Sequence, residues 1–269
     1  MKRAAILGFP VEHSLSPILH NAGYTAAGLD DWIYERIPCT EKDLPRIVSQ
    51  ADDSYRGFSV TMPGKFAALQ FADEATERAR LIGSANTLTR TEHGWRADNT
   101  DCEGIQAALD ELIDDTVLPT RAVLIGAGGT ARPAIWALGQ RGITHLTVIN
   151  RSDRRAELQS LVEHFGLDCG FTSFDDDIEQ ITMAADVIIS TVPSAGIEPH
   201  IAQLGHAPTF DVIYEPWPTP LVVRSAANGH RTVGGHVMLA AQSYSQFEQF
   251  TGIYAPRDAM RQALEAYLS

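Results

Sequence analysis

The residues of this chain most suited to chemistry form a glycine-rich segment, Gly126, Ala127, Gly128, Gly129, Thr130 and Ala131. The segment follows an apolar run at 122–125 and precedes helix-like residues at 131–138, so it fits the G-x-G-x-x-A pattern of dinucleotide-binding turns. The first glycine permits a tight turn, and the second lets the backbone approach a pyrophosphate, which a helix N-terminus attracts. An ordinary glycine-rich turn is the alternative, but a second apolar run at 146–149 completes the strand–turn–helix–strand context and favours nucleotide binding.

The residues after that second apolar run indicate which dinucleotide is bound. Domains that bind NAD usually have Asp or Glu there to hold the ribose hydroxyls. This chain instead has Asn150, Arg151 and Ser152, followed by Arg154 and Arg155. Arginine pairs with a 2′-phosphate through charge-assisted hydrogen bonds, whereas a carboxylate would repel it. The sequence therefore predicts NADP, with arginines that only cap a loop as the alternative.

A pair of serines, Ser14 and Ser16, precedes Pro17 at the start of a helix-like segment. Serine at the N-cap and proline at the first helical position are ordinary signals of a helix start, so we expect Ser16 to be the N-cap. Two hydroxyls beside the free N–H groups of a helix N-terminus would also suit a carboxylate ligand.

A lysine stands at another expected helix start. Thr61 ends a predicted strand, and Lys65 falls in the first turn of the helix that follows. The positive end of the helix dipole opposes an ammonium at that position. The placement suits a lysine that transfers protons near neutral pH, and a solvated surface lysine is the alternative.

Two more polar clusters occur at strand ends, Asn86 with Thr87 and the run from Asp98 to Asp101. Turn formation explains either cluster alone. However, ligands of open α/β sheets bind outside the carboxyl ends of strands. Because the serine pair, the lysine and these clusters all lie at such ends, we expect them to form one substrate site.

The elements that must position these residues follow an alternating pattern typical of an α/β protein. Short apolar runs predict strands at 4–7, 33–37, 57–60, 87–89, 95–97, 122–125, 146–149, 187–190, 209–212 and 232–233. Helices are expected at 17–27, 41–50, 65–71, 102–112, 131–141, 154–165, 238–250 and 257–268, and a polar turn at 114–120.

The position of the glycine-rich turn, after some 120 residues, predicts two domains. An N-terminal α/β substrate domain, residues 1–101 and 238–269, would receive the C-terminal helices as they return. A doubly wound Rossmann-type domain, residues 102–237, would bind the dinucleotide. We expect the cleft between the two domains to hold cofactor and substrate.

The composition limits the partners of this chain of 269 residues. A net charge of −13 argues against non-specific binding to nucleic acid or to an anionic membrane surface. Three widely spaced cysteines fit reduced thiols in the cytoplasm, and the scattered histidines predict no metal site. We see no signal peptide and no apolar stretch long enough to span a membrane.

Seven segments, taken in order, resemble the shikimate dehydrogenases of aromatic amino-acid biosynthesis. They are the runs at 8–21, 60–65, 83–87, 99–101, 211–216, 219–221 and 238–242. The resemblance covers nearly the whole chain. It implies reversible, NADPH-dependent reduction of 3-dehydroshikimate to shikimate. We expect the protein to be a monomer or homodimer in the cytoplasm.

The same resemblance implies a role for each matching residue. Lys65 and Asp101 would form the acid/base pair, and Ser14 and Ser16 would hold the substrate carboxylate. The ring hydroxyls would be surrounded by these two catalytic residues together with Thr61, Asn86, Tyr214 and Gln242. Val212 and Gly235 would complete the cofactor site.

Two positions depart from the family pattern, because most members carry Asn where this chain has Ser59 and Gly where it has Val237. A quinate/shikimate dehydrogenase is the nearest alternative, although such relatives tend towards NAD. A non-catalytic NADP(H)-sensing protein on the same scaffold would be free to lose Lys65 or Asp101, yet both are present. A two-domain folate or amino-acid dehydrogenase would not need the serine pair.

Overall fold

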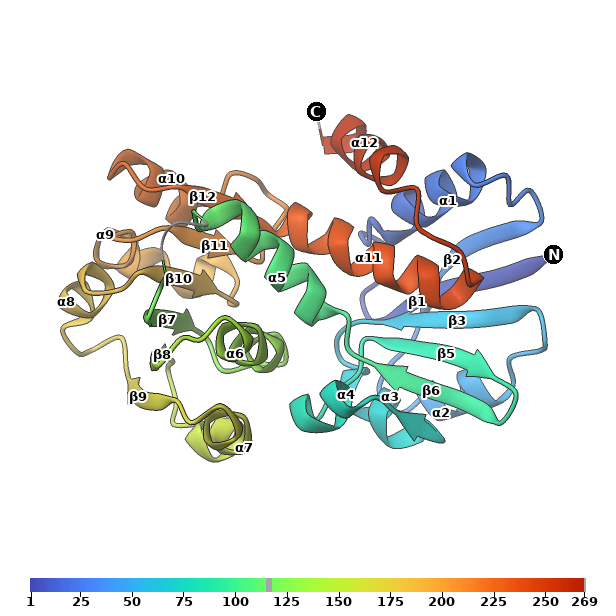
Figure 1. Cartoon of the computed structure of the whole chain (residues 1–269), viewed down its shortest axis with the longest axis horizontal. Helices are drawn as coiled ribbons and strands as arrows, with labels where there is room; N and C mark the ends of the chain where they lie inside the picture. The colour runs from blue at the N-terminus through green and yellow to red at the C-terminus, as the bar shows by residue number, and fades with distance from the viewer. Residues whose placement is uncertain (115–117, 269) are drawn as a thin grey trace. The chain divides into compact units, whose positions relative to one another are not determined.

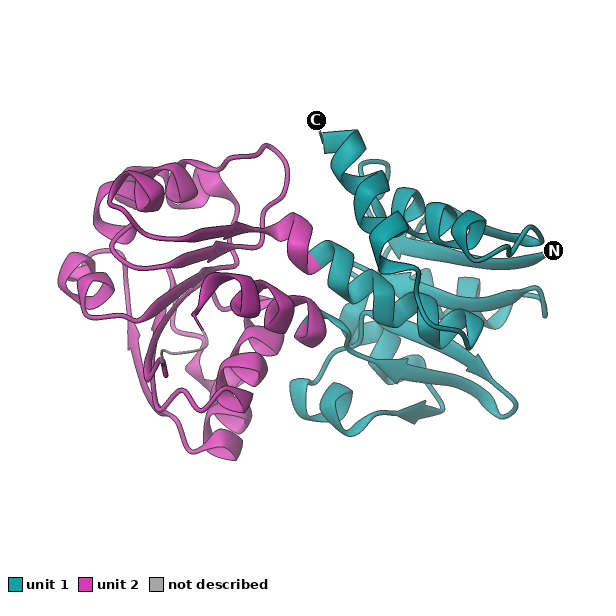
Figure 2. Cartoon of the chain, turned by 45° about the horizontal axis from the view of Figure 1, so that its top comes forward, with its two compact units in different colours: residues 1–101, 239–269 teal, residues 102–238 magenta. Residues whose placement is uncertain are grey.

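The computed structural model describes residues 1–114 and 118–268, and the chain forms two compact units. Unit 1 comprises Met1–Asp101 and Leu239–Ser269, and unit 2 comprises Cys102–Met238 (Figure 2). Three residues of the polar turn expected at 114–120, residues 115–117, lie outside the described part of the chain. Within that part, no helix is both long enough and apolar enough to cross a membrane.

Unit 1 is built on a mixed sheet of six strands in the order β2-β1-β3-β5-β6-β4 (Figure 1). The strands are β1 (Lys2–Gly8), β2 (Trp32–Pro38), β3 (Tyr55–Val60), β4 (Glu74–Ala75), β5 (Thr87–Thr91) and β6 (Gly94–Asp98). β1 pairs in parallel with β2 and β3, and β5 pairs antiparallel with β3 and β6.

Helices cover both faces of this sheet. They are α1 (Ser16–Ala26), α2 (Leu44–Ser49), α3 (Lys65–Phe71), α4 (Glu77–Ile82), the larger part of α11 (Gly235–Thr251), and α12 (Arg257–Leu268). On one face, buried side chains of α2 and α3 pack with Leu7, Phe58 and Leu88 of the strands. On the other face, the ring of Phe250 in α11 packs directly against Gly57 of β3. A Cβ added to Gly57 would lie 2.0 Å from that ring. The C-terminal helices are thus part of the core of unit 1.

Unit 2 has a six-stranded sheet in the order β12-β11-β10-β7-β8-β9, and all its pairings are parallel. The strands are β7 (Arg121–Ile125), β8 (His145–Ile149), β9 (Asp168–Thr172), β10 (Val187–Ser190), β11 (Thr209–Asp211) and β12 (Thr232–Gly234). Numbered along the chain, this order is 3-2-1-4-5-6, that of a doubly wound dinucleotide-binding sheet, whose switch point lies between its first and fourth strands.

The α-helices of unit 2 are α5 (Asp101–Leu112, all but its first residue), α6 (Ala131–Gln140), α7 (Arg155–Phe165), α8 (Ile178–Met183), α9 (Ile201–Leu204) and α10 (Pro220–Ala227). Two 3₁₀ turns, η1 (Ser194–Gly196) and η2 (Glu198–His200), precede α9. The expected α/β architecture with a Rossmann-type sheet is confirmed.

Several predicted bounds were wrong. The helix expected at 41–50 begins only at Leu44, because Thr40 and Asp43 close a turn before it with a 2.6 Å hydrogen bond. The helix expected from 238 begins at Gly235, directly after β12. Ser16 is not an N-cap: α1 begins at Ser16 itself, and the N-cap is Leu15, which has no side chain able to accept a hydrogen bond.

Candidate active site

An ion pair between Lys65 and Asp101 is the main feature of the site in unit 1. Lys65 begins α3 and Asp101 begins α5, and Lys65 Nζ lies 2.5 Å from Asp101 Oδ2. The lysine side chain is 17% exposed and the aspartate 2% exposed. The N-terminus of a helix stabilises a negative charge and opposes a positive one. α5 therefore stabilises the carboxylate of Asp101, whereas α3 opposes the ammonium of Lys65, and the carboxylate balances that ammonium charge. The pair can therefore hold a proton at Nζ in a partly buried, polar setting.

Asn86 connects this pair to helix α11. Its amide Nδ2 donates to Asp101 Oδ1 at 2.9 Å and to Gln242 Oε1 at 3.0 Å. Its Oδ1 accepts from the backbone N–H of Thr100 at 2.8 Å. Four of the predicted site residues, Lys65, Asn86, Asp101 and Gln242, thus lie in one hydrogen-bonded group.

The two serines lie at the start of α1. Ser14 Oγ and Ser16 Oγ are 3.3 Å apart, and the guanidinium of Arg36 donates to the Ser14 carbonyl oxygen at 2.7 and 3.0 Å. Because Ser16 does not cap the helix, its hydroxyl is not committed to that role. The structure brings the serines together as a pair.

Thr61 follows β3, and its N–H donates to the carbonyl of Leu7 at 2.9 Å. This bond places Thr61 beside the carboxyl end of β1, from which the chain leads to the serine pair. Among the described residues, no hydrogen bond of the Thr61 side chain links it to Lys65 or to the serines.

The glycine-rich turn of unit 2 lies between β7 and α6. Gly126 has φ +100°, which L side chains rarely adopt, and an added Cβ would lie 2.6 Å from Thr191 Oγ1. A Cβ added at Gly128 or Gly129 would meet only open space. The backbone before α6 therefore faces room that a pyrophosphate could enter, and the turn fits the predicted dinucleotide.

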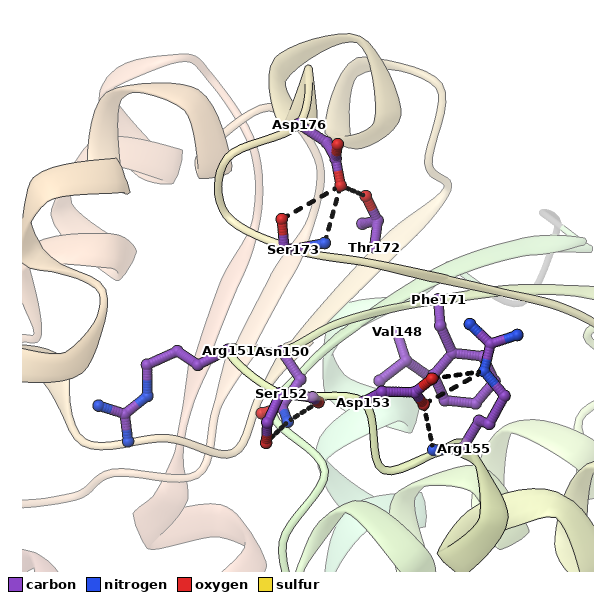
Figure 3. Close-up of a pocket in the computed structure, with 10 residues that line it drawn as sticks. All are labelled: Val148, Asn150, Arg151, Ser152, Asp153, Arg155, Phe171, Thr172, Ser173 and Asp176. Carbon is purple, nitrogen blue, oxygen red and sulfur yellow. Dashed lines mark hydrogen bonds and ion pairs between the residues drawn. The ribbon is translucent and has the colours of Figure 1, made fainter.

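The residues after β8 line a pocket of about 200 Å³ (Figure 3). Asn150 donates to the carbonyl of Ser152 at 2.8 Å, which fixes the turn. Arg151 extends away from the other residues drawn, whereas Arg155 pairs with Asp153 at 3.1 Å and lies over Phe171.

Arg154 is held differently from Arg151. Its guanidinium makes two 2.6 Å hydrogen bonds to the carboxylate of Glu157. In the described part of the chain, Arg151 is exposed and makes no ion pair. Of the two predicted phosphate ligands, Arg151 is the one whose charge is not already matched.

The remaining predicted residues of unit 2 follow β11. Val212 donates its N–H to Ser190 at 3.0 Å, and a Cβ added to Gly235 would lie 1.9 Å from the Val212 carbonyl oxygen. This close approach requires a glycine at position 235. Tyr214 is half-buried, and burial raises its pKa, with a further contribution from Glu215.

Asp98 anchors helix α11 to the sheet of unit 1, a role that was not predicted. Its carboxylate accepts two hydrogen bonds from Arg78, at 2.6 and 2.7 Å, and one from Gln249 of α11 at 2.8 Å. Burial alone would raise the pKa of Asp98, but hydrogen bonds and charge from Arg78 lower it. In the sequence, this anchor of α11 was indicated only by an acidic residue within a polar run.

A parallel sheet of Rossmann order with a glycine turn, accompanied by a second α/β unit that carries a lysine–aspartate pair, defines the class of two-domain dehydrogenases that use a dinucleotide. Three family descriptions match this chain: shikimate dehydrogenase substrate binding domain at residues 6–88, shikimate / quinate 5-dehydrogenase at 109–206, and shikimate 5′-dehydrogenase C-terminal domain at 235–265. The chain belongs to the shikimate dehydrogenase family.

Individual relatives match over nearly their whole length. The shikimate dehydrogenase (NADP(+)) of Methanocella arvoryzae is 37% identical, covering 96% of each chain. The crystal structure of Mycobacterium tuberculosis shikimate dehydrogenase is 45% identical with a TM-score of 0.92, covering 99% of this chain and 100% of that one. A Thermus thermophilus shikimate 5-dehydrogenase, solved with NADP(H) and shikimate, is 29% identical with a TM-score of 0.83, covering 99% of each chain.

Proposed function

We infer that this protein catalyses the reversible reduction of 3-dehydroshikimate to shikimate with NADPH, a step of the shikimate pathway. The observation that carries this inference is the ion pair between Lys65 and Asp101. The amide of Asn86 donates hydrogen bonds both to Asp101 and to Gln242. The lysine can transfer a proton while the carboxylate holds it in place. The uncharged amides of Asn86 and Gln242 beside them suit a ring that carries several hydroxyls.

Lys65 moves the proton of the reaction. In the direction of reduction, its ammonium donates a proton to the oxygen at ring C3 while C3 receives a hydride. In the direction of oxidation, the lysine accepts that proton from the C3 hydroxyl. Asp101 holds Nζ in place and balances its charge. NADPH, when bound, supplies the hydride.

The other residues of unit 1 bind the substrate. Ser14 and Ser16 hold its carboxylate with their hydroxyls, and the ring hydroxyls are bound by Thr61, Asn86, Tyr214 and Gln242. Support comes from the hydrogen-bonded grouping of Asn86 and Gln242 around the ion pair and from the serine hydroxyl that does not cap α1.

Unit 2 binds the cofactor. The backbone from Gly126 to Ala131 approaches the pyrophosphate, and the 2′-phosphate and ribose are bound by Asn150, Arg151, Ser152 and Arg154. Val212 and Gly235 complete the cofactor site. For Arg154 to bind phosphate, its two hydrogen bonds to Glu157 must be shared or exchanged, so Arg151 carries most of the selectivity.

We also propose that the protein acts in the cytoplasm as a monomer or homodimer, without nucleic-acid or membrane partners. Its three cysteines, at 39, 102 and 169, are widely spaced in the sequence, which fits reduced thiols. Its net charge of −13 disfavours polyanionic partners.

Initial rates with shikimate and with quinate, each measured with NADP and with NAD, test the proposal. We expect the highest kcat/KM with shikimate and NADP. A preference for quinate or for NAD would favour a quinate/shikimate dehydrogenase, and no turnover with any pair would favour a non-catalytic NADP(H)-binding protein.

A further inference from the structure

Four buried side chains of unit 1 have no role in the reaction described above, yet they connect to its residues. Each is at most 3% exposed: Tyr34, Ser59, Thr87 and Gln246. They come from β2, β3, β5 and α11, respectively. Together with Asn86 they form an unbroken series of hydrogen bonds, here called the buried array, that ends at Asp101.

A backbone carbonyl fixes the direction of the hydrogen bonds at one end of the buried array. The Asn86 carbonyl can only accept, so the Gln246 atom 3.1 Å from it must be the donor Nε2. Oε1 of Gln246 then faces Ser59, whose hydroxyl donates to it at 2.7 Å. Since Ser59 has only one hydroxyl hydrogen, Tyr34 must donate its own to Ser59, at 2.6 Å.

A backbone N–H fixes the direction at the other end. Thr100 N–H can only donate, so the Asn86 atom 2.8 Å from it must be Oδ1. Nδ2 of Asn86 then faces Asp101, which it reaches at 2.9 Å. Between the two ends, Thr87 accepts from Gln246 Nε2 at 3.0 Å and donates to Asn86 Oδ1 at 2.8 Å.

Every bond of the buried array therefore points the same way, from the phenol of Tyr34 to the carboxylate of Asp101. Hydrogen bonds aligned in series polarise and strengthen one another. The first donor is also fixed in place, because the Tyr34 ring stacks on His20 with 4.1 Å between ring centroids. Burial raises the pKa of Tyr34, so the phenol keeps the proton that it donates.

We propose that Tyr34, Ser59, Gln246 and Thr87 are positioning residues for the reaction. They hold the Asn86 amide with its NH₂ group toward Asp101 and Gln242. A reversed amide would set its oxygen against the Asp101 carboxylate and its NH₂ group against the N–H of Thr100. The buried array also opposes that state, because the hydroxyl of Thr87 donates to Asn86 Oδ1. It thereby keeps the aspartate, and with it Lys65, in the arrangement that transfers the proton.

This inference rests on the proposed function, and a matched pair of variants at Thr87 tests it. Thr87→Val keeps the branched shape and removes the hydroxyl, whereas Thr87→Ser removes a methyl and keeps the hydroxyl. Loss of a buried hydrogen bond that leaves its partners unsatisfied predicts about a tenfold fall in kcat/KM for shikimate with Thr87→Val. Thr87→Ser should stay within about twofold of the wild type by the same argument, because the bonds remain. The dissociation constant of NADP should change in neither variant.

Tyr34→Phe deletes only the first bond of the buried array and keeps the ring stack on His20. We expect about a threefold fall in kcat/KM, smaller because the site of change is further from Asn86. A packing role would instead make Thr87→Ser the worse variant at position 87 and overturn the proposal, as would wild-type activity in both Thr87→Val and Tyr34→Phe. Failure of the wild type to oxidise shikimate with NADP in the same assay would overturn the proposed function itself.

Discussion

Lys65 and Asp101 are separated by 36 positions in the sequence, and a single contact between them defines the chemistry of the site. Solvent screening weakens ion pairs between exposed groups. The lysine is largely buried, so its attraction to the Asp101 carboxylate is less screened. It is still 17% exposed, so a substrate oxygen can approach it.

Lys65→Ala should lower kcat by about 10²–10⁴, the usual contribution of a general acid or base. The KM for shikimate should rise far less, because other side chains hold the ring and the carboxylate. Steady-state kinetics test this, with Lys42→Ala at an exposed lysine as the control. A kcat within about threefold of the wild type would contradict the assigned role, because such a loss is far smaller than that expected for a general acid or base.

Asp101 is expected to act through the same step. Asp101→Asn combined with Lys65→Ala should therefore be barely worse than the worse single variant. Losses that multiply would show that the two residues act independently.

We propose that Arg151 selects the cofactor, because its charge is unmatched within the described residues, unlike those of Arg154 and Arg155. Arg151→Ala should raise the KM for NADP by about tenfold or more, since hydrogen bonds to charged groups contribute about 1.5–3 kcal/mol. The KM for NAD should hardly change. Arg155→Ala, which removes an arginine already paired with Asp153, is the control. Equal effects on both cofactors would mean that Arg151 is structural.

Among the elements of unit 2, β11 carries a buried carboxyl with a consequence for stability. Asp211, the last residue of the strand, is 1% exposed and accepts hydrogen bonds from Thr219 Oγ1 and from the N–H of Ile213. Burial raises its pKa to about 6, and the hydrogen bonds offset only part of that effect. The folded protein therefore binds this proton more tightly than the unfolded chain does.

The contribution of Asp211 to stability is greatest below the unfolded pKa and is lost as the pH rises through about 6. Asp211→Asn stays neutral and removes this dependence. Between about pH 5 and about pH 7.5, the free energy of unfolding of the wild type should fall by about 1 kcal/mol relative to the variant. Urea denaturation at both pH values measures this, with the exposed Asp175→Asn as the control. A parallel pH dependence in wild type and Asp211→Asn would refute it.

The elements also show how much the sequence could predict. The apolar strands and the glycine turn were predicted because strand periodicity and turn chemistry are local. α3 and α12 have the bounds expected for them, 65–71 and 257–268. β9 at the sheet edge was missed because Asp168–Thr172 is not an apolar run, and β4 was missed because it has two residues.

α10 was missed although its signals are ordinary, with Thr219 as a capping residue and Pro220 in the first turn. Contacts of the site across the chain were beyond sequence reasoning. The bond of Asn86 to Gln242 spans 156 positions, and that of Ser59 to Gln246 spans 187. Ser59 was noted only as a departure from the family pattern. Its hydroxyl accepts a hydrogen bond from the phenol of Tyr34 and donates one to the side-chain amide of Gln246 in α11.

For the whole molecule, the chain divides its tasks between the proposed substrate-binding unit 1 and the proposed cofactor-binding unit 2. It passes between them inside two helices, after the first residue of α5 and after Met238 within α11 (Figure 2). The net charge of −13 repels an anionic cofactor, so its binding requires local positive charges. We therefore expect the selectivity for NADP over NAD to depend on a few arginines.

Direct transfer of label tests the central claim, that this protein moves a hydride between ring C3 of shikimate and NADP. Shikimate carrying deuterium at C3 is incubated with the protein and NADP in ordinary water, and the reduced cofactor is analysed by NMR. We predict that the deuterium appears on the nicotinamide ring of NADPH and that Lys65→Ala slows the transfer without diluting the label. NADPH formed without deuterium, or no NADPH at all, would contradict the account.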